Sequence, residues 1–244
     1  MPAHKGVEVS CTAAITDSGE WLRLFPVPYR WLRPNQKFSK YQWIRVGVTK
    51  ASDPRPESYK INQETIAITS EVLSASNGWR ARKDIIFPLK SSSMCELKRR
   101  LGRDGSPTLG FFKPAAIEKL IIKPVASEWT QEELEIMRQG HLFESEPAEE
   151  LEKLPYDFSY RYRCDEPACK GHMMKCTDWE MGQSWRKWRT DYGDDWESAF
   201  RHRYEIEMRD KLDTHFYVGT LNRHPREWII VGLFYPPRVH PTLF

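Results

Sequence analysis

The sequence predicts an α+β protein built from two regions. Short segments of β-strand character separated by frequent turns fill the first 125 residues, whereas strands alternate with amphipathic helices in the rest. Four metal-capable side chains also lie within thirteen residues of the second region. These observations predict a basic, β-rich domain over 1–125 and an α+β domain with a metal-binding loop over 126–244.

The first region is predicted to consist mostly of strands. A turn composition at 17–20 separates two of them, and Pro26 ends the second. We leave 64–73 open between helix and strand, and expect 84–88 to be extended. Strands are predicted at 7–15, 21–25, 41–48, 108–112 and 116–122. Many short strands with frequent turns are typical of a small barrel or sandwich, and we favour an OB-like barrel.

Helices are predicted where caps precede amphipathic stretches. Serines at 91–93 would cap a basic helix that ends at Gly102, and capping boxes at 130–133 and 177–180 would open two further helices. The longest helix is predicted over 194–211. Its apolar face would consist of Trp196, Phe200, Tyr204 and Met208, which recur every four residues.

Three strands are predicted in the second region. Residues 158–164 alternate strictly between apolar and polar, which is typical of a half-buried strand. The apolar runs 215–220 and 228–235 fit central strands, joined as a hairpin by the turn at 222–225.

The segment that follows the first of these strands carries the spacing C-x4-C-x2-H-x3-C. Three thiols and one imidazole are the ligand set of a closed, tetrahedral Cys3His zinc site. We therefore predict a Zn²⁺ site, with zinc favoured by the softness of thiolate ligands. Its ligands would be Cys164, Cys169, His172 and Cys176. Ordinary buried cysteines near a histidine are the alternative, and a Cys176 that faced away would leave the open coordination position of a catalytic zinc.

Two carboxylates just beyond this segment are the candidate catalytic residues. Asp178 and Glu180 would act as an outer ligand or a general base in a metal-dependent hydrolase or nucleic-acid-processing enzyme. His172 would lie at the centre of this site with them, and His202, His215 or His224 would be acid–base partners. The alternative is structural, because Glu180 occupies a capping-box position where the helix dipole favours an acid.

Charge is distributed unevenly along the chain. Residues 1–125 hold 21 Lys+Arg and 11 Asp+Glu, a net charge of +10, and residues 126–244 hold 16 and 23, a net charge of −7. A basic region of this size attracts a polyanion, most commonly nucleic acid. The acidic half would suit a basic protein partner instead.

Cations interleaved with aromatic rings mark the candidate nucleic-acid contacts, because cations follow phosphates and rings stack on bases. They are Arg30, Trp31, Arg33, Lys37, Lys40, Trp43 and Arg45 in the first cluster and Lys98, Arg99 and Arg100 in the basic helix. The alternatives are a strand with its aromatics in the core and a helix with a solvated face.

The sequence thus favours a zinc-containing protein that binds DNA or RNA, with a hydrolase and a protein-interaction module as alternatives. It contains no Gly-rich nucleotide loop, no H-E-x-x-H and no G-x-S-x-G. It also shows no secretory signal and no apolar run long enough to cross a membrane, so we expect a cytoplasmic protein without membrane contact, whose clustered cysteines bind metal.

Overall fold

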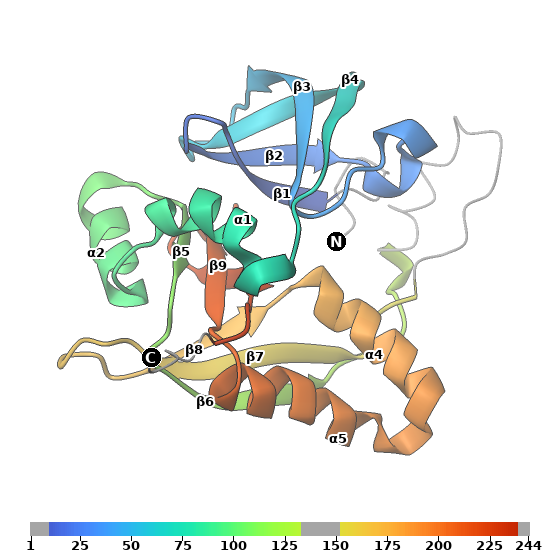
Figure 1. Ribbon diagram of the computed structural model, residues 1–244, viewed down its shortest axis with the longest axis vertical. Coiled ribbons are helices and arrows are strands. Elements are labelled where there is room, and N and C mark those ends of the chain that lie inside the picture. The colour runs from blue at the N-terminus through green and yellow to red at the C-terminus, as the bar shows by residue number, and fades with distance from the viewer. Residues whose placement is uncertain (1–9, 133–151, 239–244) are drawn as a thin grey trace. The chain divides into compact units, whose positions relative to one another are not determined.

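The computed structural model describes residues 10–132 and 152–238 (Figure 1). The chain divides into two compact units: unit 1 comprises Met1–Leu73 and Pro124–Tyr156, and unit 2 comprises Ser74–Lys123 and Asp157–Phe244. Both sheets and helices are present, so the α+β class is confirmed. The division differs from the one predicted at residue 125, because residues 74–123 belong to the same unit as the C-terminal region.

Unit 1 contains a four-stranded sheet in the order β1-β2-β4-β3. Its strands are β1 (Ser10–Ile15), β2 (Trp21–Val27), β3 (Gln42–Lys50) and β4 (Ser58–Val72), with short 3-10 turns at Tyr29–Trp31 and Pro34–Gln36. Of the segment left open at 64–73, residues 64–72 are part of β4, as their β-branched residues favour. Within the described residues β1 and β3 are outer strands, so the expected OB-like barrel closure is not observed.

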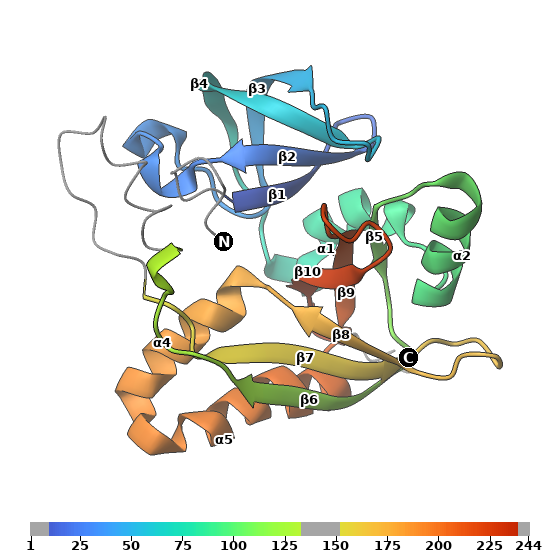
Figure 2. The ribbon, with the colours of Figure 1, turned by 180° about the vertical axis from the view of Figure 1, so that it is seen from behind.

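Unit 2 contains a six-stranded sheet in the order β5-β9-β10-β8-β7-β6, whose strands β8, β7 and β6 lie side by side in Figure 2. The strands are β5 (Leu109–Phe112), β6 (Ala116–Pro124), β7 (Tyr156–Arg163), β8 (His172–Cys176), β9 (His215–Thr220) and β10 (Trp228–Phe234). The two apolar runs pair antiparallel as the predicted hairpin, β9 with β10. β10 also pairs with β8, in parallel.

Helices flank this sheet. They are α1 (Ser76–Ile86), α2 (Met94–Asp104), α4 (Trp179–Tyr192), α5 (Trp196–Arg201) and α6 (Met208–Asp210), with a π-helical segment at His202–Glu207 and 3-10 turns at Phe87–Leu89 and Gly193–Asp195. The prediction of an extended segment at 84–88 is wrong, because these residues belong to α1 and the following 3-10 turn. The helix expected from 130 lies largely outside the described residues.

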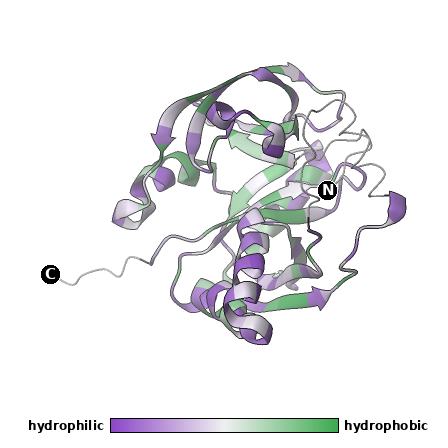
Figure 3. Cartoon of the chain, turned by 90° about the vertical axis from the view of Figure 1, so that its right-hand side faces the viewer, coloured by the Kyte–Doolittle hydropathy of each residue, from purple (hydrophilic) through white to green (hydrophobic). Residues whose placement is uncertain are grey.

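The core of unit 2 is aromatic. Tyr160 is fully buried in β7 and donates a hydrogen bond of 2.7 Å to the carbonyl of Tyr204, which fixes the helical segment on the sheet. Phe200 stacks on Phe158 with ring centroids 4.6 Å apart. In Figure 3, green hydrophobic segments are concentrated on the central strands, whereas the helices carry both purple and green residues. No helix of the described residues is long and apolar enough to span a membrane.

Replacing Phe200 by alanine should lower the free energy of unfolding by about 3–5 kcal/mol, because a fully buried ring is lost and a cavity remains. Ile206→Ala, in the same helical run at a side chain that is 40% exposed, is the matched control and should cost less than about 1 kcal/mol. Urea unfolding followed by circular dichroism measures both. Equal losses would contradict the assigned apolar face.

Candidate metal centre

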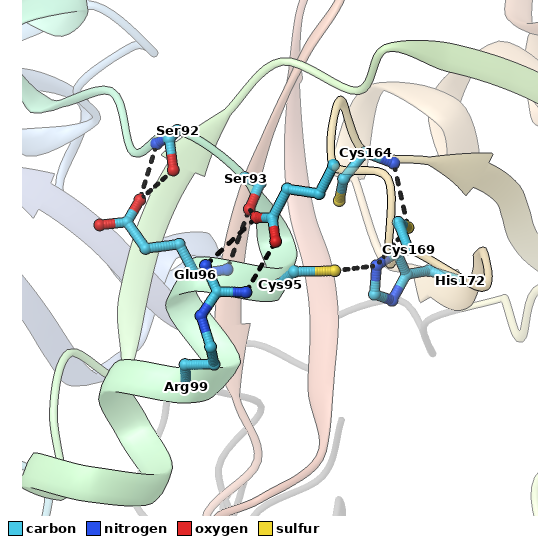
Figure 4. Close-up of polar contacts among 9 residues, drawn as sticks. Ser92, Ser93, Cys95, Glu96, Arg99, Cys164, Cys169 and His172 are labelled. Carbon is cyan, nitrogen blue, oxygen red and sulfur yellow. Dashed lines mark hydrogen bonds and ion pairs between the residues drawn. The ribbon is translucent and has the colours of Figure 1, made fainter.

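Four side chains converge between α2 and the β7–β8 loop. Cys95, Cys164, Cys169 and His172 each offer a ligand atom, and these atoms lie within 4.8 Å of one another. Cys95 is the second residue of α2, Cys164 and Cys169 belong to the loop, and His172 begins β8 (Figure 4). The structure therefore brings three of the four sequence-predicted ligands together and adds Cys95.

The spacing of the ligand atoms fits a zinc ion. Tetrahedral zinc, with bonds of about 2.3 Å to sulfur and about 2.0 Å to nitrogen, sets sulfur and nitrogen roughly 3.5 Å apart and two sulfurs roughly 3.8 Å apart. His172 Nε2 lies 3.2 Å from Cys95 Sγ and 3.4 Å from Cys169 Sγ. Small outward shifts of these atoms would accommodate the ion.

Cys176 is not a member of this group, which corrects the predicted ligand set. It lies four positions beyond His172 along the strand, a distance of roughly 13 Å at about 3.3 Å per residue. Its side chain is buried in β8, at the position that pairs with Phe158 of β7. It serves as a small core residue, whereas Cys95, 69 residues before Cys164 in the chain, completes the group.

The start of α2 is firmly capped, which positions Cys95. Ser93 Oγ accepts a hydrogen bond of 2.9 Å from the backbone N–H of Glu96. The Glu96 carboxylate in turn accepts bonds from the backbone N–H of Ser92 at 2.9 Å and from its hydroxyl at 2.5 Å. This is a capping box shifted by one residue. The predicted cap is confirmed, and the helix continues past Gly102 to Gly105, whose φ of +69° ends it.

Glu166 ties the loop to the same helix. It lies between Cys164 and Cys169, and its carboxylate accepts a bond of 2.7 Å from Arg99 and another from the Ser93 hydroxyl. Hydrogen bonds lower the pKa of Glu166 and keep it ionised, with the largest effect from Arg99 and the next from Ser93.

α2 also packs tightly on β5, because a Cβ at Gly110 would lie 2.7 Å from Leu97.

Backbone N–H groups face the sulfurs. Cys169 Sγ accepts a bond of 3.3 Å from the N–H of Cys164, which is the main reason that the pKa of Cys169 is lowered. Burial raises the pKa of Cys164, while the N–H groups of Cys95 and Met94 in the first turn of α2 partly offset it. Such N–H···S bonds stabilise thiolates and are typical partners of metal ligands.

The thiols oppose one another's ionisation when no cation lies between them. Burial raises the pKa of Cys95 to about 12, and the charges of Cys164 and Cys169 add to the effect. A divalent cation would remove this cost of ionising the thiols, because its positive charge offsets the negative thiolates and favours loss of their protons. The chemistry of the donor set thus fits a bound metal.

His172 is held in the neutral form that metals bind. Its pKa is lowered by burial first and by the nearby charge of Lys98 second. The ring stacks on Tyr162 with centroids 5.1 Å apart. Lys98 Nζ lies 3.4 Å from Nδ1 and can only donate, so this contact places the ring proton on Nε2. Coordination through Nε2 would move the proton to Nδ1 and displace the exposed Lys98.

The candidate catalytic carboxylates have structural partners. Asp178 is buried and is the N-cap of α4, where Oδ1 accepts the N–H groups of Glu180 and Met181 and Oδ2 accepts that of Leu233 in β10. Glu180 accepts a bond of 2.8 Å from the Tyr235 hydroxyl. Both lie beyond the end of β8 opposite His172, and neither belongs to the metal-ligand group.

The three histidines considered as acid–base partners also lie elsewhere. His215 is buried at the start of β9. His202 lies 3.7 Å from Glu207 in the helical run after α5, and His224 is exposed in the β9–β10 turn. Within the described residues, none of them is a member of the metal-ligand group.

The candidate nucleic-acid residues fall in both units. In unit 1, Arg33 pairs with Glu64 at 2.8 Å. The other members there are Arg30 and Trp31 in the first 3-10 turn, exposed Lys37 and Lys40, and Trp43 and Arg45 on β3. Trp31 and Trp43 are half-buried.

The cations of α2 in unit 2 are engaged locally. Lys98 contacts His172, Arg99 pairs with Glu166 at 2.7 Å, and Arg100 lies 4.0 Å from Glu96. Arg99 therefore contributes to the metal centre. The carboxylates of Glu166 and Glu96 therefore partly offset the charges of Arg99 and Arg100.

The positive charge is concentrated in part of unit 2. Residues 74–123 hold 11 Lys+Arg and 4 Asp+Glu, a net charge of +7, whereas residues 157–238 hold 14 of each. The whole acidic excess of the second half lies in 126–156, with 2 Lys+Arg and 9 Asp+Glu, a net charge of −7. Unit 2 is therefore more basic than the whole-chain charge of +3 indicates.

Two family models match the chain. One, described as a Domain of unknown function (DUF8757), matches residues 90–244, and another, described as a Domain of unknown function (DUF8758), matches residues 1–88. The chain belongs to the DUF8757 family, whose model covers more than half of it. No curated protein and no solved structure matches it. All four members of the metal group lie within 90–244, so one family model contains the complete group.

Cys95→Ser should weaken zinc binding by more than about 100-fold, because a direct ligand is lost and outer partners alone are worth about 10–100-fold. Cys176→Ser should leave zinc affinity within about twofold, because this thiol lies roughly 13 Å from His172. The zinc affinity of Glu166→Gln should lie between those of these two variants. Competition titration against a chromophoric chelator measures all three. Loss of zinc in Cys176→Ser but not in Cys95→Ser would contradict the assignment.

Proposed function

We propose that this is a zinc-containing nucleic-acid-binding protein of the cytoplasm, in which a structural zinc fixes α2 to the β7–β8 loop. The observation that carries the proposal is the group of three thiols and one imidazole within 4.8 Å. Soft thiolate ligands favour zinc over harder divalent cations. Four protein ligands close the coordination sphere, which is typical of a structural rather than a catalytic site.

The charge of unit 2 supports the nucleic-acid part of the proposal. The net +7 of residues 74–123 includes the sequence of α2, which the zinc would hold in place. Lys170 adds an exposed cation in the metal-binding loop. A concentration of positive charge of this size attracts phosphate backbones and accelerates their association.

The hydrolase alternative has less support. It requires an open coordination position and a nearby base, yet Asp178 and Glu180 are engaged with α4, β10 and Tyr235. The interaction-module alternative is favoured by the net −7 of residues 126–156, which would suit a basic protein. A pull-down that resists nuclease treatment would favour that alternative.

The zinc-loaded protein should bind labelled DNA or RNA oligonucleotides, as measured by fluorescence anisotropy. Three phosphate contacts on duplex DNA predict roughly 40-fold weaker binding at 200 mM than at 50 mM salt. Cys169→Ser, which removes a ligand, should lower both zinc content and affinity, whereas Cys11→Ser is the matched control outside the group. Absence of binding to DNA and RNA at 50 mM salt would overturn the nucleic-acid proposal, and metal-free purified protein that takes up no zinc would overturn the metal proposal.

A further inference from the structure

Three lysines that lie outside the metal centre gather at one end of the sheet of unit 2. Lys83 is in the last turn of α1, Lys90 follows the 3-10 turn Phe87–Leu89, and Lys113 follows β5. The ammonium groups of Lys83 and Lys90 each lie 5.8 Å from the centroid of the Phe87 ring. We refer to Lys83, Lys90 and Lys113 as the lysine triad.

The backbone brings these three segments together. Lys90 forms an isolated parallel bridge with Phe111 in β5, and the N–H of Ser91 donates to the Phe111 carbonyl at 2.8 Å. The rings of Phe87 and Phe111 both lie 5.1 Å from that of His215, which begins β9. Lys83 and Lys90 therefore lie against a packed aromatic cluster, and Lys113 follows the strand that carries Phe111.

One carboxylate partly neutralises the triad. Asp213 pairs with Lys113 at 2.6 Å. Burial opposes the ionisation of Asp213, but the Lys113 hydrogen bond and the nearby charges of Lys113 and Lys83 lower its pKa overall. Within the described residues, Lys83 and Lys90 form no ion pair and instead lie over the Phe87 ring, so their two positive charges are not neutralised by a carboxylate contact.

His215 contributes no charge of its own at neutral pH. Burial, assisted by the charges of Lys113 and Lys90, lowers its pKa to about 4 against the attraction of Asp213. Its Nδ1 donates to the Asp213 carbonyl at 2.8 Å, so Nε2 is the unprotonated nitrogen. The positive excess at this site therefore comes from the triad.

We propose that the lysine triad is a phosphate-binding site and that, resting on the proposed function, it holds a phosphodiester of the bound nucleic acid. Like charges held together repel unless an anion joins them, and lysine ammonium groups bind phosphates as flexible point charges. The triad is better suited to this than α2, whose Arg99 and Arg103 pair with Glu166 and Asp104 at 2.7 Å.

The test compares two double variants with the same loss of charge. Lys83→Gln/Lys90→Gln removes two members of the triad, and Lys119→Gln/Lys123→Gln removes two exposed lysines of β6 in the same unit. Lys113 is kept, because its loss would leave Asp213 without this partner. Zinc content and circular dichroism should match the unaltered protein in both variants, which establishes that they are folded.

The triad variant should bind oligonucleotides at least about 10-fold more weakly, and its salt slope on duplex DNA should fall by about 1.8, or 0.9 for each lost contact. The β6 variant should stay within about twofold. Equal weakening in both variants would overturn the phosphate site while the nucleic-acid function stands.

Free tripolyphosphate separates the two possible sources of the phosphate. Tripolyphosphate should raise the melting temperature of the unaltered protein and of the β6 variant, but not that of the triad variant. If this result is obtained and the protein binds no nucleic acid, the phosphate site stands and the nucleic-acid function is overturned. If neither probe binds, both are overturned.

Discussion

The structure around α2 places three thiols and one imidazole close together. The negative charges of the thiolates must therefore be stabilised by nearby groups. N–H groups from the first turn of α2 and from the loop stabilise individual sulfurs, but burial and mutual repulsion still raise the pKa of Cys95 to about 12. A bound divalent cation would resolve this conflict. It would also join two segments that lie 69 residues apart, so metal binding and the folding of unit 2 would be linked.

This arrangement gives the basic residues of unit 2 different roles. Arg99 contacts Glu166 and thereby holds the loop against α2, although sequence reasoning treated it as a phosphate contact. The proposed phosphate contacts shift to the lysine triad, where Asp213 pairs with Lys113, and Lys83 and Lys90 form no ion pair within the described residues. A cation is available to a ligand only when its own protein has not already neutralised it.

Local patterns in the sequence predicted much of the fold. Two patterns were sufficient to predict these elements, because burial imposes their periods directly. They are the apolar runs of β9 and β10 and the four-residue repeat of Trp196, Phe200, Tyr204 and Met208. α1 was missed because three residues with left-handed φ, Asn77, Gly78 and Trp79, precede its regular turns, and its last residues were expected to be extended. The four-stranded sheet of unit 1 was foreseen as strands but not as an open arrangement.

The metal-ligand group shows the limit of predicting ligands from their spacing in the sequence. Cys164, Cys169 and His172 fit within a short hairpin loop, and their spacing alone brought them into consideration. Cys176 belonged to the same motif, but β8 already begins at His172 and the strand's rise carries Cys176 away. Cys95 depends on tertiary packing. Its one local signal is its position in the first turn of a serine-capped helix, where thiolates are favoured.

The coordination sphere of the zinc-loaded protein is the most direct measure of this account. X-ray absorption spectroscopy at the zinc edge should give three sulfur ligands at about 2.3 Å and one nitrogen at about 2.0 Å. The spectrum of Cys176→Ser should be unchanged, and that of Cys95→Ser should show two sulfurs. A four-sulfur sphere, or one in which Cys176→Ser loses a sulfur, would contradict the central claim that Cys95, Cys164, Cys169 and His172 bind the metal.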